Sequence, residues 1–193
     1  MNNCYLDAEA VITFFRMSGR KHIFITGSRG SGKSHLVNNM LKCMSDSFNL
    51  LQSHRTDTPQ VVIKSNLVAD NKEFVIGVPR TSGINPASKG NNMTIIEDGF
   101  INCAIPAIDT HLDTTPERLF VIDELGYLES SCIPFQKAVE ILLDNSHVLA
   151  VIRKQSTEFL NRICNRKDVL VIDIDSTFET LSCIIMASGM SKR

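Results

Sequence analysis

The chain has 193 residues, of which 43% are hydrophobic and 21% charged, and its formal net charge is -1. These values are typical of a soluble globular protein with a sizeable core, and we expect one domain over residues 1–193. The lack of a basic excess argues against a protein that binds nucleic acid through many phosphates. No secretory signal or run of ~20 apolar residues is visible, so we expect a cytoplasmic protein without membrane contact.

Six cysteines, at 4, 43, 103, 132, 164 and 183, show no C-x-x-C spacing, and the five histidines show no metal-ligand spacing. We therefore expect reduced, mostly buried thiols and no zinc or redox motif.

The amino-terminal half opens with helical spacing over 7–18 and a stop signal at Gly19. A β-rich run, "HIFIT" (22–26), leads into the glycine-rich "GSRGSGKS" (27–34), and "SHLVNNMLKCM" (34–44) returns to helical spacing. Three short runs, at 49–53, 60–64 and 73–78, are predicted strands. Residues 80–92 are rich in Gly, Ser, Asn and Pro and predict a mobile loop, which is either a surface insertion or a lid over the nucleotide.

The second half alternates more regularly. Helices are predicted over 97–108, where Pro106 raises doubt about the last turn, and over 133–145, 156–166 and 177–188. Apolar strands are predicted over 118–123, 147–152 and 169–174. This alternation predicts an α/β fold, a three-layer α/β/α sandwich with a mostly parallel sheet.

The stretch 27–34 fits the pattern G-x-x-x-x-G-K-[ST] of a phosphate-binding loop (Walker A) between a strand and a helix. Glycines let successive N–H groups point at phosphate oxygens, and the helix start adds its positive dipole end. Lys33 would reach the β- and γ-phosphates, and Ser34 would place its hydroxyl on Mg²⁺. The expected nucleotide-binding set is Gly27, Ser28, Arg29, Gly30, Ser31, Gly32, Lys33, Ser34 and His35, although Arg29 is as well explained by solvent exposure and His35 by packing.

A second motif, "LFVIDELG" (119–126), places two acidic residues at the carboxyl end of a buried strand, where α/β sheets bind ligands. Asp123 would hold Mg²⁺, and Glu124 would orient or deprotonate a water aimed at the γ-phosphate. The alternative for Glu124 is a structural cap or ion pair.

Basic and acidic residues also end two other predicted strands. Arg153 and Lys154 follow 147–152 and either contact the γ-phosphate, as an arginine finger does, or form a solvated basic pair. Asp173 and Asp175 end the last strand and are expected to begin a helix cap rather than to bind metal.

Four segments, "HIFITGSRGSGKSHLV", "FVIDELGYLE", "PFQKAVEILLDNSHVLAVIRK" and "FLNRICNRKDVLVIDID", together resemble the small thermophile and cancer-related nucleoside-triphosphatase family of P-loop proteins. The resemblance covers 22–35 and 118–175. It implies Mg²⁺-dependent hydrolysis of ATP, GTP or other nucleoside triphosphates with broad base tolerance and slow turnover. It assigns 27–34 to the phosphate loop, Asp123 and Glu124 to the metal and water sides, and Arg153 to the family's basic pair.

The chain also departs from the family pattern. Ser28 and Arg29 stand where family loops have prolines, the family's glycine- and tyrosine-containing segment is not recognisable, and residues 1–20 are interpreted as an added helix. Two other functions stay open. A nucleotide or nucleoside kinase would use the same loop but needs an arginine-rich lid, and an ATP-binding regulatory or loader module needs a helical lid domain. A protein partner also stays open.

Overall fold

The computed structural model describes residues 7–44, 47–80 and 93–176. Its helices are α1 (Ala8–Ser18), α2 (Lys33–Met44), α3 (Glu97–Gly99), the π-helical turn η2 (Phe100–Ala104), α4 (Ile105–Thr114), α5 (Ile133–Asn145) and α6 (Glu158–Cys164), with short 3-10 turns η1 (Ala69–Asn71) and η3 (Glu129–Ser131). Its strands are β1 (His22–Gly27), β2 (Phe48–Arg55), β3 (Val61–Ser65), β4 (Phe74–Pro79), β5 (Met93–Ile95), β6 (Leu119–Leu125), β7 (His147–Arg153) and β8 (Val169–Asp173).

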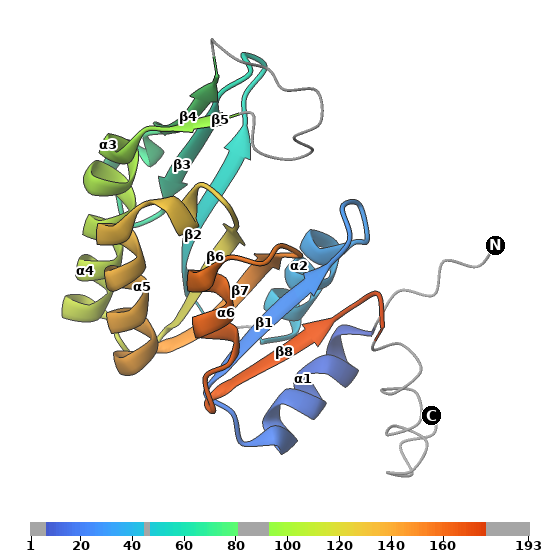
Figure 1. Cartoon of the computed structure of the whole chain (residues 1–193). Helices are drawn as coiled ribbons and strands as arrows, with labels where there is room; N and C mark the ends of the chain where they lie inside the picture. The colour runs from blue at the N-terminus through green and yellow to red at the C-terminus, as the bar shows by residue number, and fades with distance from the viewer. Residues whose placement is uncertain (1–6, 45–46, 81–92, 177–193) are drawn as a thin grey trace.

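The strands form one sheet in the order β5-β4-β3-β2-β6-β7-β1-β8. The five strands from β2 to β8 in this order run parallel, so their carboxyl ends meet at one edge. β3, β4 and β5 continue the sheet antiparallel beyond β2, at the top of Figure 1. The predicted α/β fold with a mostly parallel sheet is confirmed.

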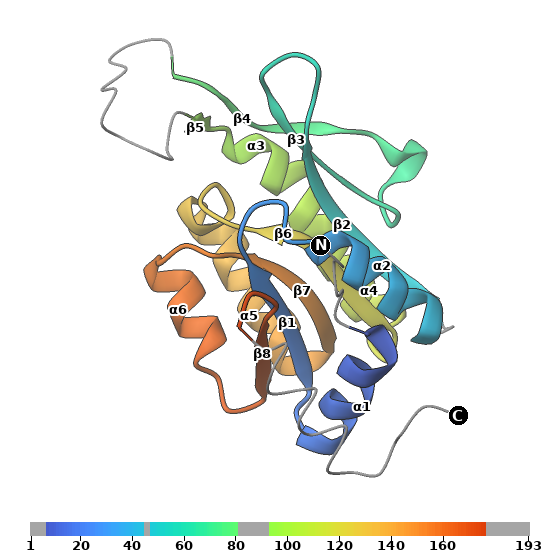
Figure 2. The same cartoon turned by 90° about the vertical axis from the view of Figure 1, so that its right-hand side faces the viewer.

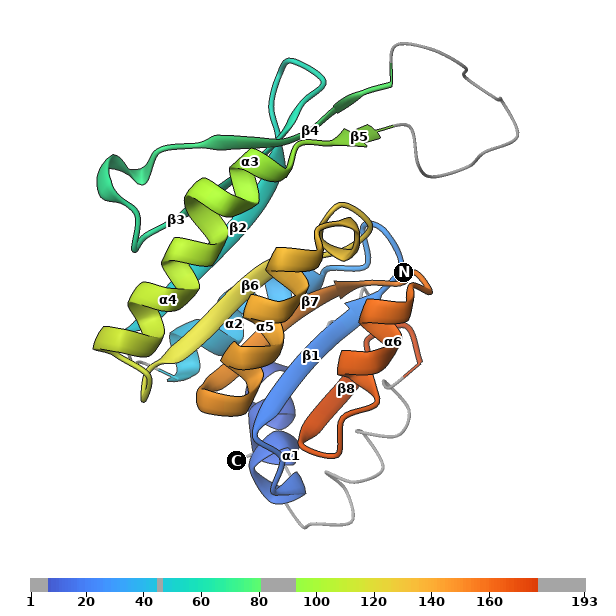
Figure 3. The same ribbon diagram turned by 60° about the vertical axis from the view of Figure 1, so that its left-hand side comes forward.

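Helices cover both faces of the parallel strands. Figure 2 shows α1 and α2 on one side of the sheet and α6 on the other, and Figure 3 shows α4, α5 and α6 along that second face. Consecutive side chains of the central strands bury themselves on opposite faces: Phe24 lies in the core under α4–α6, whereas Ile23 and Ile25 lie in the core under α1 and α2. This two-sided burial explains why the strands are apolar at successive positions.

Most predicted elements are confirmed, and two differences have local causes. The helix predicted over 97–108 does not weaken at Pro106 but continues to Thr114. A π-helical turn precedes it, and Pro106 stands in the first turn of α4, where a missing N–H is tolerated. β5 was not predicted because three residues are too few to show a period.

Some expectations fall outside the described residues, namely most of the predicted loop 80–92 and the predicted helix 177–188.

Among the described cysteines, Cys103 and Cys132 are buried and Cys164 half-buried, as expected, but Cys43 is exposed. None of the helices within 7–44, 47–80 and 93–176 is long and apolar enough to cross a membrane.

Candidate active site

The predicted phosphate loop joins the end of β1 to the start of α2. Gly30 and Gly32 have positive φ angles of 77° and 94°, which side chains other than glycine adopt at a cost. The Lys33 ammonium folds back over the loop and donates to the carbonyl oxygens of Gly27 (3.0 Å) and Ser28 (2.8 Å). The loop therefore has the strand–loop–helix context and the compact turn that the motif requires.

Three further residues of the predicted nucleotide-binding set are exposed: Arg29, Ser34 and His35. Ser34 lies in the first turn of α2, at the positive end of the helix. His35 Nε2 lies 3.0 Å from the Asn39 side-chain amide, and because His35 is exposed it does not pack in the core, as the alternative explanation supposed.

Asp123 lies near the end of β6, two strands from β1 in the sheet. The Gln52 amide on β2 donates to its carboxylate over a long 3.4 Å. Burial raises the pKa of Asp123, while the Gln52 hydrogen bond and the positive charge of Lys33 lower it. The neighbouring Glu124 carboxylate raises the pKa of Asp123 further.

Glu124 and Arg153 meet at the carboxyl edge between β6 and β7. The Arg153 guanidinium donates from Nε to Glu124 Oε1 at 2.9 Å, and both side chains are partly exposed. Arg153 is also the register partner of Gly27, the first residue of the phosphate loop. Parallel pairing thus places Arg153 directly beside the loop and brings Glu124 to the same edge.

Lys154, next along the chain, points to other carboxylates. Its ammonium lies 2.8 Å from Asp173 and 3.1 Å from Asp175, at the end of β8. The Asp175 N–H donates to Asp173 Oδ1 at 3.1 Å, but the helix that these two residues were expected to cap lies outside the described residues. The contacts of Lys154 and of Asp175 across the sheet edge were not predicted.

Glu129 is a polar residue of the site that the sequence analysis did not select. Its side chain is only 6% exposed, and Oε2 accepts from the Gly126 N–H at 2.9 Å. Burial raises the pKa of Glu129 to about 7, against the lowering effect of backbone hydrogen bonds. Glu129 thereby fixes the turn that follows Glu124. Glu129 is the last residue of the segment "FVIDELGYLE". The sequence alone gave no reason to select it, because its contact with the Gly126 N–H depends on how the turn folds.

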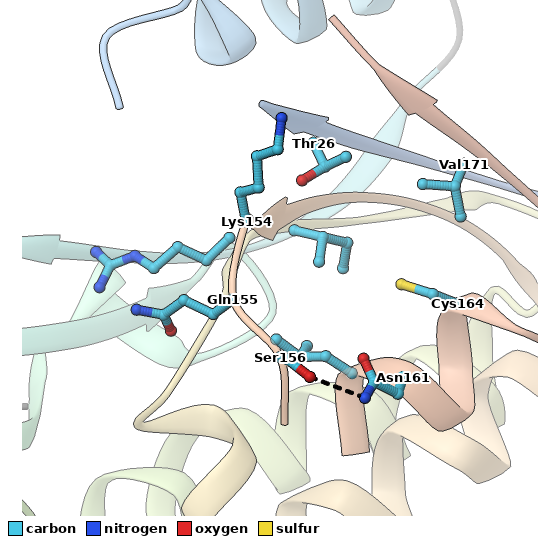
Figure 4. Close-up of a pocket in the computed structure, with 10 residues that line it drawn as sticks. Thr26, Lys154, Gln155, Ser156, Asn161, Cys164 and Val171 are labelled. Atoms are coloured by element: carbon cyan, nitrogen blue, oxygen red, sulfur yellow. Dashed lines mark hydrogen bonds between the residues drawn. The ribbon is translucent and has the colours of Figure 1, made fainter. Parts of the chain in front are cut away.

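A cavity of about 310 Å³ lies beside these residues, between α6 and the ends of β1, β7 and β8. Figure 4 shows Thr26, Val171 and Cys164 around it, with Ser156 and Asn161 joined by a hydrogen bond at its lower rim. Arg153 and Lys154 also line it. The cavity lies on the α6 face of the sheet, whereas α2, which begins at the phosphate loop, covers the other face (Figure 2).

Comparison with known proteins gives consistent matches. The model of the family described as NTPase matches residues 22–179. The nucleoside-triphosphatase THEP1 of Thermotoga sp. (strain RQ2) is 25% identical over 155 residues, 79% of this chain and 86% of that protein. The protein of the same name from Thermotoga maritima is 23% identical over 154 residues, with the same shares.

Solved structures agree in fold. The crystal structure of THEP1 from the hyperthermophile Aquifex aeolicus matches with a TM-score of 0.63 at 17% identity, over 89% of this chain and 99% of that one. The solution structure of a human cancer-related nucleoside triphosphatase matches with a TM-score of 0.60 at 20% identity, over 90% and 100%. The fold is therefore that of the small P-loop NTPases, and with a family match that runs from the first residue of β1 past the end of β8, the chain belongs to the NTPase family.

Proposed function

We propose that the chain hydrolyses nucleoside 5′-triphosphates to the diphosphate and phosphate, with Mg²⁺ bound beside the substrate and a water positioned by Glu124. The family match and the names of the relatives support hydrolysis of nucleoside triphosphates. The choice of Glu124 and Arg153 as the residues of the chemical step rests on their meeting at one edge of the sheet. Arg153 pairs in register with Gly27 and donates a hydrogen bond to Glu124 at 2.9 Å.

The phosphate loop supplies binding. Lys33 exchanges its two carbonyl partners in the loop for β- and γ-phosphate oxygens, which are stronger acceptors because they are charged. Ser34, at the start of α2, lies where the helix dipole favours an anion. These groups locate the triphosphate without reading the base, which fits broad base tolerance.

Two described residues fit a magnesium ion. Mg²⁺ prefers hard oxygen ligands and keeps several waters, so it needs few protein side chains. Ser34, in the first turn of α2, offers a hydroxyl, and Asp123, near the end of β6, offers a carboxylate. When bound, the ion would neutralise charge on the β- and γ-phosphate oxygens.

Glu124 and Arg153 supply the chemical step. Glu124 orients a water and takes its proton as the water oxygen bonds to the γ-phosphorus and the bond to the β-phosphate oxygen breaks. Arg153 offsets charge on the γ-phosphoryl oxygens, and its ion pair with Glu124 keeps both side chains at the edge until substrate arrives.

A phosphate-release assay with ATP, GTP, CTP and UTP tests this function, with no acceptor added, in Mg²⁺ and in excess EDTA. We expect release from all four in Mg²⁺ and none in EDTA. Release that appears only with an added nucleoside or nucleotide acceptor would indicate a kinase. Release that depends on single-stranded nucleic acid would indicate a loader module.

A further inference from the structure

Residues 174–175, which follow β8, pack against the start of the phosphate loop. The Ile174 N–H donates to the Thr26 carbonyl at 2.9 Å, immediately before the loop. Gly27 packs so closely on this segment that a Cβ there would lie 2.7 Å from Ile174 Cγ1. Because no side chain fits between them, the position of residues 174–175 and the position of the loop are coupled.

Asp175 binds the loop directly. Its Oδ2 accepts from both the Ser28 N–H and the Ser28 hydroxyl, each at 2.7 Å. The Ser28 hydrogen bonds and then Lys154 hold the pKa of Asp175 at about 2, so the carboxylate is charged at neutral pH. On its other side, the Ser28 carbonyl accepts from Lys33 at 2.8 Å. One residue of the loop is thus held between Asp175 and the phosphate-binding lysine.

Lys154 holds Asp175 in turn. Its ammonium bridges Asp173 (2.8 Å) and Asp175 (3.1 Å). In Figure 4 it extends from the segment after β7 across the end of β1, past Thr26. The charge of Lys154 is therefore balanced by two carboxylates, whereas that of its neighbour Arg153 is balanced by Glu124.

We propose that Asp175 is a positioning residue for the phosphate loop in the reaction, and that Lys154 acts through Asp175 rather than on the γ-phosphate. The expected effects on KM and kcat rest on the proposed function, whereas the expected effect on nucleotide affinity does not. The proposal gives separate roles to Arg153, which ends β7, and to Lys154, which follows it: Arg153 serves the chemical step, and Lys154 holds the phosphate loop in place through Asp175.

The physical reason is preorganisation. Residues 28–30 of the loop are exposed, and three of its glycines occupy positive φ, so few packing contacts hold residues 28–30. Hydrogen bonds to a charged acceptor are stronger than neutral ones, and a loop already held in its binding conformation loses less entropy when the nucleotide binds. Removing Asp175 should weaken binding and leave the groups of the chemical step in place.

We expect substitution of Asp175 to change KM and Kd but not kcat. Asp175→Ala should raise KM, and the Kd of a non-hydrolysable NTP analogue, by roughly 5- to 30-fold, while kcat stays within about threefold. Asp175→Asn keeps an oxygen for the Ser28 N–H and should restore part of the affinity. Glu140→Gln is the matched control, because it breaks a similarly exposed ion pair, between Glu140 on α5 and Arg162 on α6, and should change neither constant.

A double-mutant cycle separates the roles of Lys154. Lys154→Met should raise KM in the wild-type chain but add nothing in the Asp175→Ala background, because its partner is already gone. An equal fall in kcat in both backgrounds would place Lys154 on the γ-phosphate and overturn the proposal, as would an unchanged Kd in Asp175→Ala.

The binding measurement keeps this proposal apart from the proposed function. If the wild-type chain releases no phosphate, the function is wrong, but Kd values for the analogue still decide the role of Asp175. Thermal unfolding of each variant checks that the fold is kept. If Asp175→Ala fails to fold, Asp175→Asn and Lys154→Met carry the same comparison, and an unchanged Kd in both contradicts the proposal.

Discussion

The buried carboxyl group of Glu129 makes the stability of the fold depend on pH. It lies under the turn after Glu124, with the Gly126 N–H and the Ser53 hydroxyl as hydrogen-bond donors at 2.9 and 3.4 Å. Glu124 and Arg153 are the charged groups that influence it, in opposite directions. Because burial raises its pKa from 4.5 to about 7, the folded state binds its proton more tightly than the unfolded state does. The stability that this proton contributes is complete below pH 4.5 and is lost as the pH rises through 7.

Glu129→Gln should therefore change the pH dependence of stability. The amide keeps an acceptor for Gly126 but carries no charge to bury, so the free energy of unfolding of the variant relative to wild type should rise by ~1–3 kcal/mol between pH 5 and pH 8. Urea denaturation at both pH values measures it. The exposed Glu140→Gln should show no such change, and a constant difference for Glu129→Gln would contradict the account.

In the proposed function, Lys33 is the residue on which nucleotide binding depends most. Lys33→Ala removes the point charge that we propose faces the β- and γ-phosphates, and we expect the Kd for Mg-ATP to rise at least about tenfold. Lys33→Arg is the matched comparison, because it keeps the charge in a shape that a tight loop accommodates poorly. Fluorescent-nucleotide titration measures both, and unchanged binding in Lys33→Ala would remove 27–34 as the phosphate site.

At the scale of elements, local sequence signals account for most helix boundaries. α5 spans 133–145 as predicted, with Pro134 in its first turn. α1 begins after an Asp7 cap and ends at Gly19 in the left-handed region (φ 63°). The sequence signals mislead where a helix departs from the regular α-helical hydrogen-bond pattern. The π-helical turn before α4 shifts this pattern, so Pro106 stands in the first turn of α4 and does not mark a helix end.

The cap of α6 gives a prediction at this scale. The Thr157 hydroxyl accepts from the Leu160 N–H at 3.1 Å and donates to Ser130 at 3.0 Å, which ties α6 to the segment after Glu129. Thr157→Ala should lower the free energy of unfolding by ~1 kcal/mol, whereas Thr157→Ser should keep nearly all of it. Chemical denaturation of the pair measures this. Equal losses in both variants would show that the methyl group, and not the cap, is what stabilises α6.

For the whole molecule, the sequence predicted which residues end strands but not which strands are neighbours. Glu124 and Arg153 were each placed at a strand end, and their pairing follows only from β6 and β7 being adjacent. The same holds for Ser28 and Asp175, which lie 147 residues apart and meet because β8 pairs with β1. Strand order depends on how two cores fill on opposite faces of the sheet, and no local period encodes it.

The central claim is that the carboxylate after β6 acts on the triphosphate held by the loop after β1. Glu124→Gln tests it most directly, with single-turnover phosphate release and analogue binding measured on the same preparation. We predict that the Kd stays within about threefold and that turnover falls by about 10²–10⁴-fold, since the amide fills the same space but takes no proton. Turnover at the wild-type rate in a folded, nucleotide-binding variant would contradict the account.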